Sequence, residues 1–153
     1  MTRTSSPWLR LLLVLATACG CAASRTSAAD PAAAWQQSYD AGRDAYERAD
    51  YNRAQKMFAT AVKEAERFGD QDPRLARSLN DLAAAYAVQG KYPEAEPLYQ
   101  RSLAILKQVR GPDHADVATV LLNYAELLQA TNRGAEAAKL EARAKAIREQ
   151  AGR

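Results

Sequence analysis

Hydrophobic residues recur at helical spacing along most of this chain, from about residue 35 to the C-terminal region. In the clearest stretch the apolar positions step by four, three and four residues, which places them on one face of a helix with 3.6 residues per turn. These positions are Leu75, Leu79, Leu82 and Tyr86. A second stripe of the same kind begins at Ala95. Polar residues fall between the stripes, so the pattern predicts amphipathic helices with one buried face.

Residues that start and stop helices divide these stripes into short segments. Asp72 followed by Pro73 is typical of a helix N-terminus, because aspartate caps free backbone N–H groups and proline fits the first helical position. Gly90 and Asn132 follow the stripes at equivalent places, and both residue types adopt the left-handed conformation that ends many helices. Short helices joined by short turns fold as antiparallel hairpins. The sequence therefore predicts an all-α fold.

The hairpin pattern occurs three times along the chain. Residues 75–106 align with residues 117–148 at an offset of 42, and the aligned positions share their apolar or charged character. An earlier copy begins at Trp35 and aligns with the second copy at an offset of 41. A fixed period of this length is typical of a solenoid, in which each repeat buries its apolar face against the next.

Residues at fixed positions of each copy resemble the tetratricopeptide repeat, in the 42-residue form found in kinesin light chains and in many bacterial proteins. The family pattern has a small residue in the first helix, an alanine early in the second helix and then a large residue. The matching residues are Gly42, Ala83 and Ala125, then Ala54, Ala95 and Ala137, then Phe58 and Tyr99, with Glu141 departing from the pattern. The linker GPDHADVA at residues 111–118 also resembles the long form. The resemblance implies a right-handed α-solenoid of three antiparallel helix-turn-helix repeats, at about residues 35–68, 73–110 and 115–150.

Two departures from the family pattern concern the ends of the solenoid. In the first copy the usual large positions of the first helix are Ser38, Ala41 and Ala45, so we expect that helix to pack weakly. In the third copy, Glu141 and Arg143 make the outer side of the last helix polar. A polar outer side is expected of an end repeat, because no neighbour covers it.

The resemblance also implies a concave face made by the first helix of each repeat, where related proteins hold an extended peptide or a partner helix. Carried over by position, this partner-binding groove consists of Tyr39, Arg43, Tyr46, Arg77, Asn80, Asn123 and Glu126. Asparagine can donate to and accept from a peptide backbone, and tyrosine supplies rigid apolar area with a polar tip. Asn80 lies one place earlier in its repeat than Asn123, so the match to a peptide clamp is partial. Each of these side chains could instead bond a neighbouring helix or close the end of the solenoid.

The first 18 residues have the features of a secretory signal. Arg3 and Arg10 precede an uncharged run at 11–18, which is too short for a membrane span of about 20 residues. The small residues before Cys19 resemble the lipobox of a bacterial lipoprotein, whose cysteine is lipidated and becomes the new N-terminus. The resemblance implies lipidation of Cys19, with Cys21 as the alternative, and an exported protein anchored to the periplasmic face of the outer membrane. An ordinary cleaved signal with two incidental cysteines is the other interpretation.

Residues 19–34 are predicted to form a flexible tether, because their small side chains have no large apolar surface to bury. The chain has no cysteine after residue 21. We therefore expect neither a disulfide within the domain nor a cysteine-based zinc site.

Composition favours helix and argues against catalysis. Alanine supplies 34 of the 153 residues and phenylalanine only two, which suits helices better than strands. Without the two arginines of the leader the chain has 19 basic and 18 acidic residues, interspersed without a basic cluster. Nucleic acid is therefore not an expected partner. The single histidine, His114, is expected to cap or pack at the start of a helix, and we expect no metal, no cofactor and no enzymatic activity.

Two functions fit these features. The first is a membrane-anchored adaptor, whose repeats recruit a protein or peptide partner in the bacterial cell envelope. The second is a structural or assembly subunit that self-associates or joins a larger machine such as a pilus or secretion channel. For the second function, the helix at 35–48 is the expected docking end, because it carries Trp35 and Tyr39.

Overall fold

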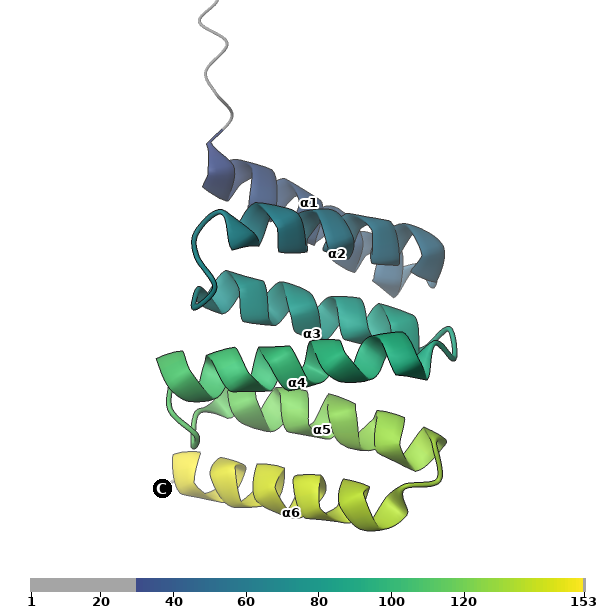
Figure 1. The fold of residues 1–153 in the computed structure, drawn as a ribbon, viewed down its shortest axis with the longest axis vertical. Coiled ribbons are helices and arrows are strands. Elements are labelled where there is room, and N and C mark those ends of the chain that lie inside the picture. The colour runs from purple at the N-terminus through teal and green to yellow at the C-terminus, as the bar shows by residue number, and fades with distance from the viewer. Residues whose placement is uncertain (1–29, 153) are drawn as a thin grey trace, which may run out of the picture.

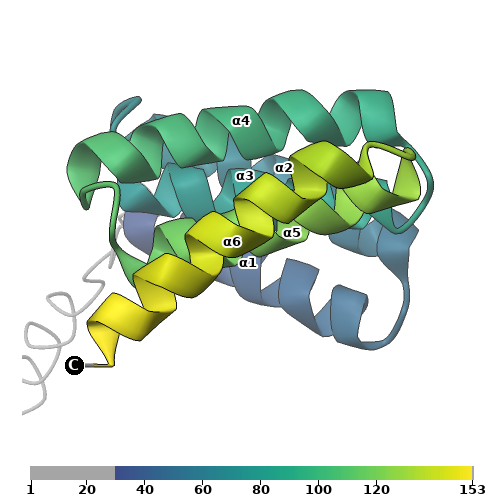
Figure 2. The same ribbon diagram turned by 90° about the horizontal axis from the view of Figure 1, so that it is seen from below.

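The computed structural model describes residues 30–152, which form six α-helices stacked in chain order (Figure 1). They are α1 (Pro31–Glu47), α2 (Tyr51–Glu66), α3 (Pro73–Ala87), α4 (Tyr92–Val109), α5 (Ala115–Ala130) and α6 (Gly134–Ala151). Each helix packs against the next, so the predicted all-α solenoid is confirmed. Seen from below, the repeats are rotated relative to one another, and α6 runs obliquely to α4 (Figure 2). None of the described helices is both long enough and apolar enough to cross a membrane.

Helix α1 begins inside the segment that was expected to be a tether. Oδ1 of Asp30 accepts a hydrogen bond from the backbone N–H of Ala32 at 3.0 Å, and Pro31 is the first helical residue. This is the same Asp-Pro pair that starts α3, and three alanines then continue the helix. The tether prediction was therefore wrong for residues 31–34, which form the first turn of α1.

Side-chain caps and left-handed residues set the helix ends at the predicted places. Oδ1 of Asp72 and Nδ1 of His114 each accept from the backbone N–H two residues later, at 2.8 and 3.1 Å. Capping thus accounts for the only histidine of the chain. Gly90 and Asn132 have φ angles of +74° and +61°, as predicted. In the first repeat Ala49 takes this conformation, with φ of +59°, at a cost of about 1 kcal/mol for a residue with a Cβ atom.

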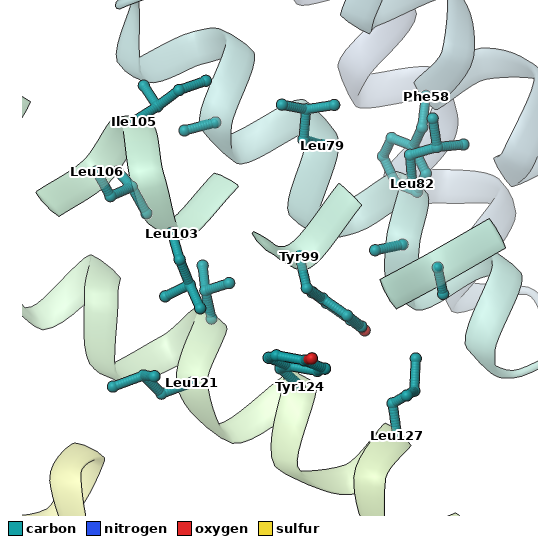
Figure 3. Close-up of a cluster of buried hydrophobic side chains, with 14 of the residues drawn as sticks. Phe58, Leu79, Leu82, Tyr99, Leu103, Ile105, Leu106, Leu121, Tyr124 and Leu127 are labelled. Carbon is teal, nitrogen blue, oxygen red and sulfur yellow. The ribbon is translucent and has the colours of Figure 1, made fainter. Parts of the chain in front are cut away.

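The core is a continuous apolar layer between successive helices. At its centre lie Phe58 of α2 and Tyr99 of α4, the large residues expected of the second helices, and each is 2 % exposed. Leucines of α3 and α5 pack around them, among them Leu82 and Leu127 (Figure 3). Burial of this surface, at about 25 cal/mol per Å² of apolar area, is the main force that holds the repeats together.

Aromatic contacts fix the first repeat, which was expected to pack weakly. Trp35 and Tyr39 stack with ring centroids 5.2 Å apart, and the ring of Tyr39 lies 5.9 Å from that of Phe58. The indole N–H of Trp35 donates to Oγ of Ser78 in α3 at 2.9 Å. The expectation was wrong because α1 fills its interface from Trp35 and Tyr39, which lie outside the positions that the family pattern makes large.

The same contacts involve the docking end that was expected at residues 35–48. Trp35 is 6 % exposed and Tyr39 is 7 % exposed, so neither side chain presents a large apolar surface to a second copy. In α3, Ser78 accepts a hydrogen bond from the indole N–H of Trp35, and Asp81 accepts one from the hydroxyl of Tyr39. The two side chains that suggested a docking end there are therefore buried within the chain, and self-association stays a prediction.

The third repeat is held to the second by a polar contact as well as by apolar packing. Glu96 of α4 accepts a hydrogen bond from the hydroxyl of Tyr124 in α5 at 2.5 Å. The same carboxylate accepts from Nη1 of Arg133, just before α6, at 2.7 Å. Helix α6 itself buries only Ala137, Ala144 and Ile147 among its 18 residues, as suits an end helix.

Replacing Glu96 with glutamine is expected to lower the free energy of unfolding at neutral pH by about 1 kcal/mol, because the charge-assisted bond to Arg133 is lost. The Tyr124 hydroxyl and the Arg133 guanidinium hold the pKa of Glu96 below its usual range. A carboxylate with a lower pKa in the folded chain adds stability above its unfolded pKa, and this stability is lost as pH falls through the folded pKa.

Urea denaturation at a series of pH values from neutral into the acid range tests this prediction. The wild type should lose more stability on acidification than the glutamine variant, because only the wild type has this carboxylate to protonate. Equal losses of unfolding free energy in the two proteins on acidification would contradict a stabilising role of the Glu96 carboxylate.

Candidate functional site

The first helices of the three repeats, α1, α3 and α5, share one face of the solenoid, which we call the A-helix face. Helix α3 contacts α5 directly, and side chains of α1 reach α3. Two hollows lie along this face, with volumes of about 480 and 470 Å³. Volumes of this order are typical of sites that enclose a small molecule or a few side chains.

The first hollow, which we call the aromatic hollow, has mostly apolar walls. They are formed by Tyr46, Phe58, Val88, Tyr92, Tyr99 and Leu127, together with three alanines. Its polar lining consists of Arg43, Glu47, Asp81, Asn123 and Glu126. Val88 is 46 % exposed and is the one large hydrophobic side chain that the described part of the chain exposes. An exposed apolar side chain beside an apolar hollow is typical of a contact surface.

Two stacked tyrosines of the core differ in how their hydroxyls are satisfied. Tyr99 and Tyr124 lie one over the other, with ring centroids 5.8 Å apart (Figure 3). The hydroxyl of Tyr124 donates to Glu96 and accepts from Gln100. The hydroxyl of Tyr99 has no hydrogen-bond partner among residues 30–152, although the residue is only 2 % exposed and lines the aromatic hollow. Among the described residues every fully buried side-chain nitrogen or oxygen has a hydrogen-bond partner, so this oxygen reaches the open space of the hollow and is available to an occupant.

The second hollow, which we call the arginine hollow, is more polar. Its lining includes Arg74, Arg77 and Arg110, beside Trp35 and Tyr39. Arg74 is engaged within the chain: its Nη2 lies 2.8 Å from Oδ2 of Asp72, and its guanidinium lies 3.5 Å from the ring centroid of Phe68. Among the described residues, Arg77 and Arg110 have no ion-pair partner within 4.0 Å.

A chain of hydrogen bonds crosses the A-helix face between the two hollows. The Tyr39 hydroxyl donates to Oδ2 of Asp81 at 2.5 Å, and Nδ2 of Asn80 donates to Oδ1 of the same carboxylate at 2.8 Å. Nδ2 of Asn123 then donates to Oδ1 of Asn80 at 3.0 Å. These four side chains link α1, α3 and α5, and Asp81 contributes to the lining of both hollows. The amide orientations follow from this network.

The charge of Asp81 is stabilised by these donors against the cost of its burial. Burial raises the pKa of Asp81, and the hydrogen bonds from Tyr39 and Asn80 partly oppose that shift. Burial and the neighbouring carboxylate also raise the pKa of the Tyr39 hydroxyl, so it stays protonated and remains a donor. The network therefore fixes a carboxylate at the boundary of the two hollows.

The seven residues of the expected groove divide between the two hollows. Arg43, Tyr46, Asn123 and Glu126 line the aromatic hollow, and Tyr39, Arg77 and Asn80 line the arginine hollow. Tyr39 and Asn80 are more than nine-tenths buried and bond neighbouring helices, which is the structural role that the sequence left open for them. A role in binding stays a prediction for all seven. Cys19 and Cys21, the expected lipidation sites, lie outside the described residues.

Several residues of the aromatic hollow were not anticipated as site residues, among them Asp81, Val88 and Tyr92. Arg77, Asp81, Ala84 and Val88 follow one another at steps of four, three and four residues, the spacing of one helix face. The sequence alone could therefore have placed Asp81 and Val88 on the same helix face as Arg77. Tyr92 could not be found in this way, because it starts α4 and reaches the face from a second helix.

The side chains of the described residues form no cluster suited to metal binding. Residues 30–152 contain no group of three or more histidine, cysteine, aspartate or glutamate side chains placed to hold a metal ion. His114 uses Nδ1 as a helix cap. What the A-helix face offers instead is shape, aromatic surface and hydrogen-bonding groups.

Comparisons with known proteins agree with this architecture. A family model described as tetratricopeptide repeat matches residues 32–107 and, overlapping them, residues 74–150. Among solved structures, BtubC (BKLC) from P. vanneervenii is similar in fold, with a TM-score of 0.74 and 23 % sequence identity. The similarity covers 79 % of this chain and 48 % of that chain, so this chain spans about half the length of BtubC. At this identity the likeness shows the fold alone.

Proposed function

This chain belongs to the tetratricopeptide repeat family, and on that basis we propose that it is a membrane-anchored adaptor whose A-helix face holds a segment of a protein partner in the bacterial cell envelope. Repeats of this family generally bind protein or peptide partners and are typically non-catalytic. The adaptor works by surface complementarity, and the anchor keeps the captured partner close to the membrane.

The observation that carries the proposal is the aromatic hollow. A stable monomeric domain gains by burying its aromatic side chains, yet here Tyr46 and Tyr92 are only half-buried and line, with the exposed Val88, an open hollow of about 480 Å³. Tyrosine side chains in a partly desolvated pocket are typical of the energetic centre of a protein interface. The polar groups around them allow a partner segment to be oriented as well as buried.

The cell-envelope location rests on the leader alone. The signal-like first 18 residues and the two cysteines that follow them support export and lipidation at Cys19, or at Cys21. Multiple acyl chains would hold the protein stably, because each buried methylene contributes about 0.8 kcal/mol to membrane binding. The short chain between the anchor and α1 would keep the A-helix face near the membrane.

Cross-linked capture from membranes tests the adaptor role. The intact protein is compared with a variant carrying Arg43→Ala, Val88→Ser and Glu126→Ala, three exposed residues of the aromatic hollow. The matched control carries Ala138→Ser, Lys139→Ala and Glu149→Ala, which are exposed residues of α6. We expect a partner captured by the wild type and the control and lost with the hollow variant, with all three proteins equally helical by circular dichroism. A partner retained by the hollow variant would contradict the proposal.

Replacing the cysteines tests the anchor separately. A Cys19→Ser, Cys21→Ser variant is expected to leave the membrane fraction and to lose incorporation of labelled palmitate, while the wild type retains both. Single variants would then identify the modified cysteine. If the wild type stayed in the membrane fraction without incorporating label, lipidation would be contradicted. The adaptor role of the repeats would not be affected by that result, because the capture experiment tests it separately.

A further inference from the structure

The charged groups around the aromatic hollow have an excess of negative charge. Its lining contains three carboxylates, Glu47, Asp81 and Glu126, and one basic residue, Arg43. Arg43 lies 3.4 Å from the carboxylate of Glu47, so these two charges largely offset each other. Glu126 has no ion-pair partner within 4.0 Å among residues 30–152, and the Asp81 carboxylate receives only neutral donors, Tyr39 and Asn80. The hollow is therefore rich in acceptors and in negative charge.

Its walls are suited to a flat cation. Tyr46, Tyr92 and Tyr99 contribute aromatic rings, whose negative faces attract a cation that lies within about 6 Å of the ring centroid. The Tyr99 hydroxyl supplies an acceptor that no described residue uses. Burial first, and then the nearby Tyr46, Glu126 and Asp81, raise the pKa of the Tyr99 hydroxyl, so this hydroxyl stays protonated at neutral pH.

We propose that the aromatic hollow binds the side chain of an arginine in a segment of the partner protein. The proposal rests on the proposed function and names the chemistry of its partner. The guanidinium can stack on the half-buried rings of Tyr46 and Tyr92 while its N–H groups donate to the Glu126 carboxylate and the Tyr99 hydroxyl. Its aliphatic stem, and an apolar neighbour in the segment, lie against Val88 and Leu127.

Other occupants fit less well. A carboxylate would be repelled by Glu126 and Asp81, and the arginine hollow on the other side of the network offers Arg77 and Arg110 for an anion. A wholly apolar side chain would bury the Glu126 carboxylate without a partner, which is costly. Lysine carries the same charge but lacks the planar fork that can stack and donate at the same time.

Three blocked heptapeptides of alanine and leucine, which differ only in a central arginine, citrulline or glutamate, test the proposal. Citrulline keeps the shape of arginine and removes its charge. Each peptide is titrated into the full chain in mild detergent and followed by amide shifts in two-dimensional NMR spectra. The arginine peptide is expected to bind about tenfold more tightly than the citrulline peptide, and its shifts should centre on residues 84–88.

Two variants identify the groups that recognise the arginine. Glu126→Gln should weaken the arginine peptide about fivefold and leave the citrulline peptide unchanged. The matched control, Glu149→Gln on α6, should change neither. Tyr99→Phe should weaken the arginine peptide about threefold without lowering the melting temperature, because its hydroxyl has no partner to lose within the described chain. A purely structural hydroxyl would instead change the melting temperature and not the binding.

The remaining outcomes overturn the proposal in distinguishable ways. Equal binding of all three peptides at residues 84–88 would leave the hollow as a binding site but contradict selection of arginine. Tighter binding of the glutamate peptide, or shifts centred on Arg77, would assign recognition to the arginine hollow. No binding of any peptide at millimolar concentration would contradict this inference alone, since the membrane capture tests the adaptor role with the natural partner.

Discussion

Replacing Trp35 with alanine is expected to lower the free energy of unfolding by about 3–5 kcal/mol, the usual cost of removing a buried large aromatic side chain. The indole is 6 % exposed, stacks on Tyr39 and donates a hydrogen bond to Ser78 across the boundary between the first two repeats. Its loss leaves a cavity and an unsupported first helix, while the Ser78 hydroxyl keeps its hydrogen bond to the Arg74 carbonyl at 2.9 Å. In a solenoid, each repeat depends on its contact with the next, so the first repeat should unfold before the others.

Urea denaturation of the full chain measures this effect. Two further variants separate the contribution of the buried apolar area from that of the hydrogen bond. Trp35→Phe keeps most of the apolar area, and Ser78→Ala removes the acceptor of the indole N–H together with the hydroxyl's own bond to the Arg74 carbonyl. Each should cost about 1 kcal/mol, the usual worth of one hydrogen bond. A loss below about 1 kcal/mol for the alanine variant would show that the first helix does pack weakly after all.

Replacing Gly42 with alanine is expected to destabilise the protein by about 2 kcal/mol, even though alanine is the better helix former. A Cβ atom at this position would lie 2.6 Å from Cδ1 and Cε1 of Phe58, which is far inside van der Waals contact. The ring is 2 % exposed and has little room to move. Overpacking of a core costs about 1–3 kcal/mol, more than the gain of about 1 kcal/mol in helix propensity.

A double-mutant cycle identifies the clash as the cause. Phe58→Leu removes the ring edge that the new methyl group meets, so adding it to Gly42→Ala should cost less than the sum of the two single effects. Gly134→Ala is the matched control, since a Cβ atom there meets nothing within 4 Å. That control should be neutral or stabilising. Additive losses in the cycle would contradict the packing explanation.

Much of the fold could be predicted because its signals are local. The period of the apolar stripes, the Asp-Pro start at residue 72 and the left-handed residues Gly90 and Asn132 each act within a few residues of the chain. The packing of the first helix was harder to predict, because the family pattern expects large side chains only at fixed positions, which are Ser38, Ala41 and Ala45 in this helix. Trp35 and Tyr39 fill the interface from other positions, and only the spatial arrangement shows that α3 receives them.

The candidate site shows the limit of position-by-position reasoning. Asn80 and Asn123 lie one place out of register between repeats, which in the sequence counted against a shared role. In the structure this shift is what brings the two amides together at 3.0 Å. Tyr39 likewise bonds Asp81, the residue after its equivalent at an offset of 41. Because adjacent repeats are rotated relative to one another, a side chain meets the neighbour of its equivalent position in the next repeat (Figure 2). An alignment of the repeats contains no information on that rotation.

The adaptor role predicts which surface of the solenoid meets a partner. A photo-reactive residue placed at Val88 lies at the aromatic hollow, and one placed at Lys139 lies on the exposed side of α6. Irradiation of living cells that express each variant, followed by denaturing gels, therefore tests the central claim most directly. We predict one discrete cross-linked product from position 88 and none from position 139. A product from position 139 alone would contradict the assignment of binding to the A-helix face.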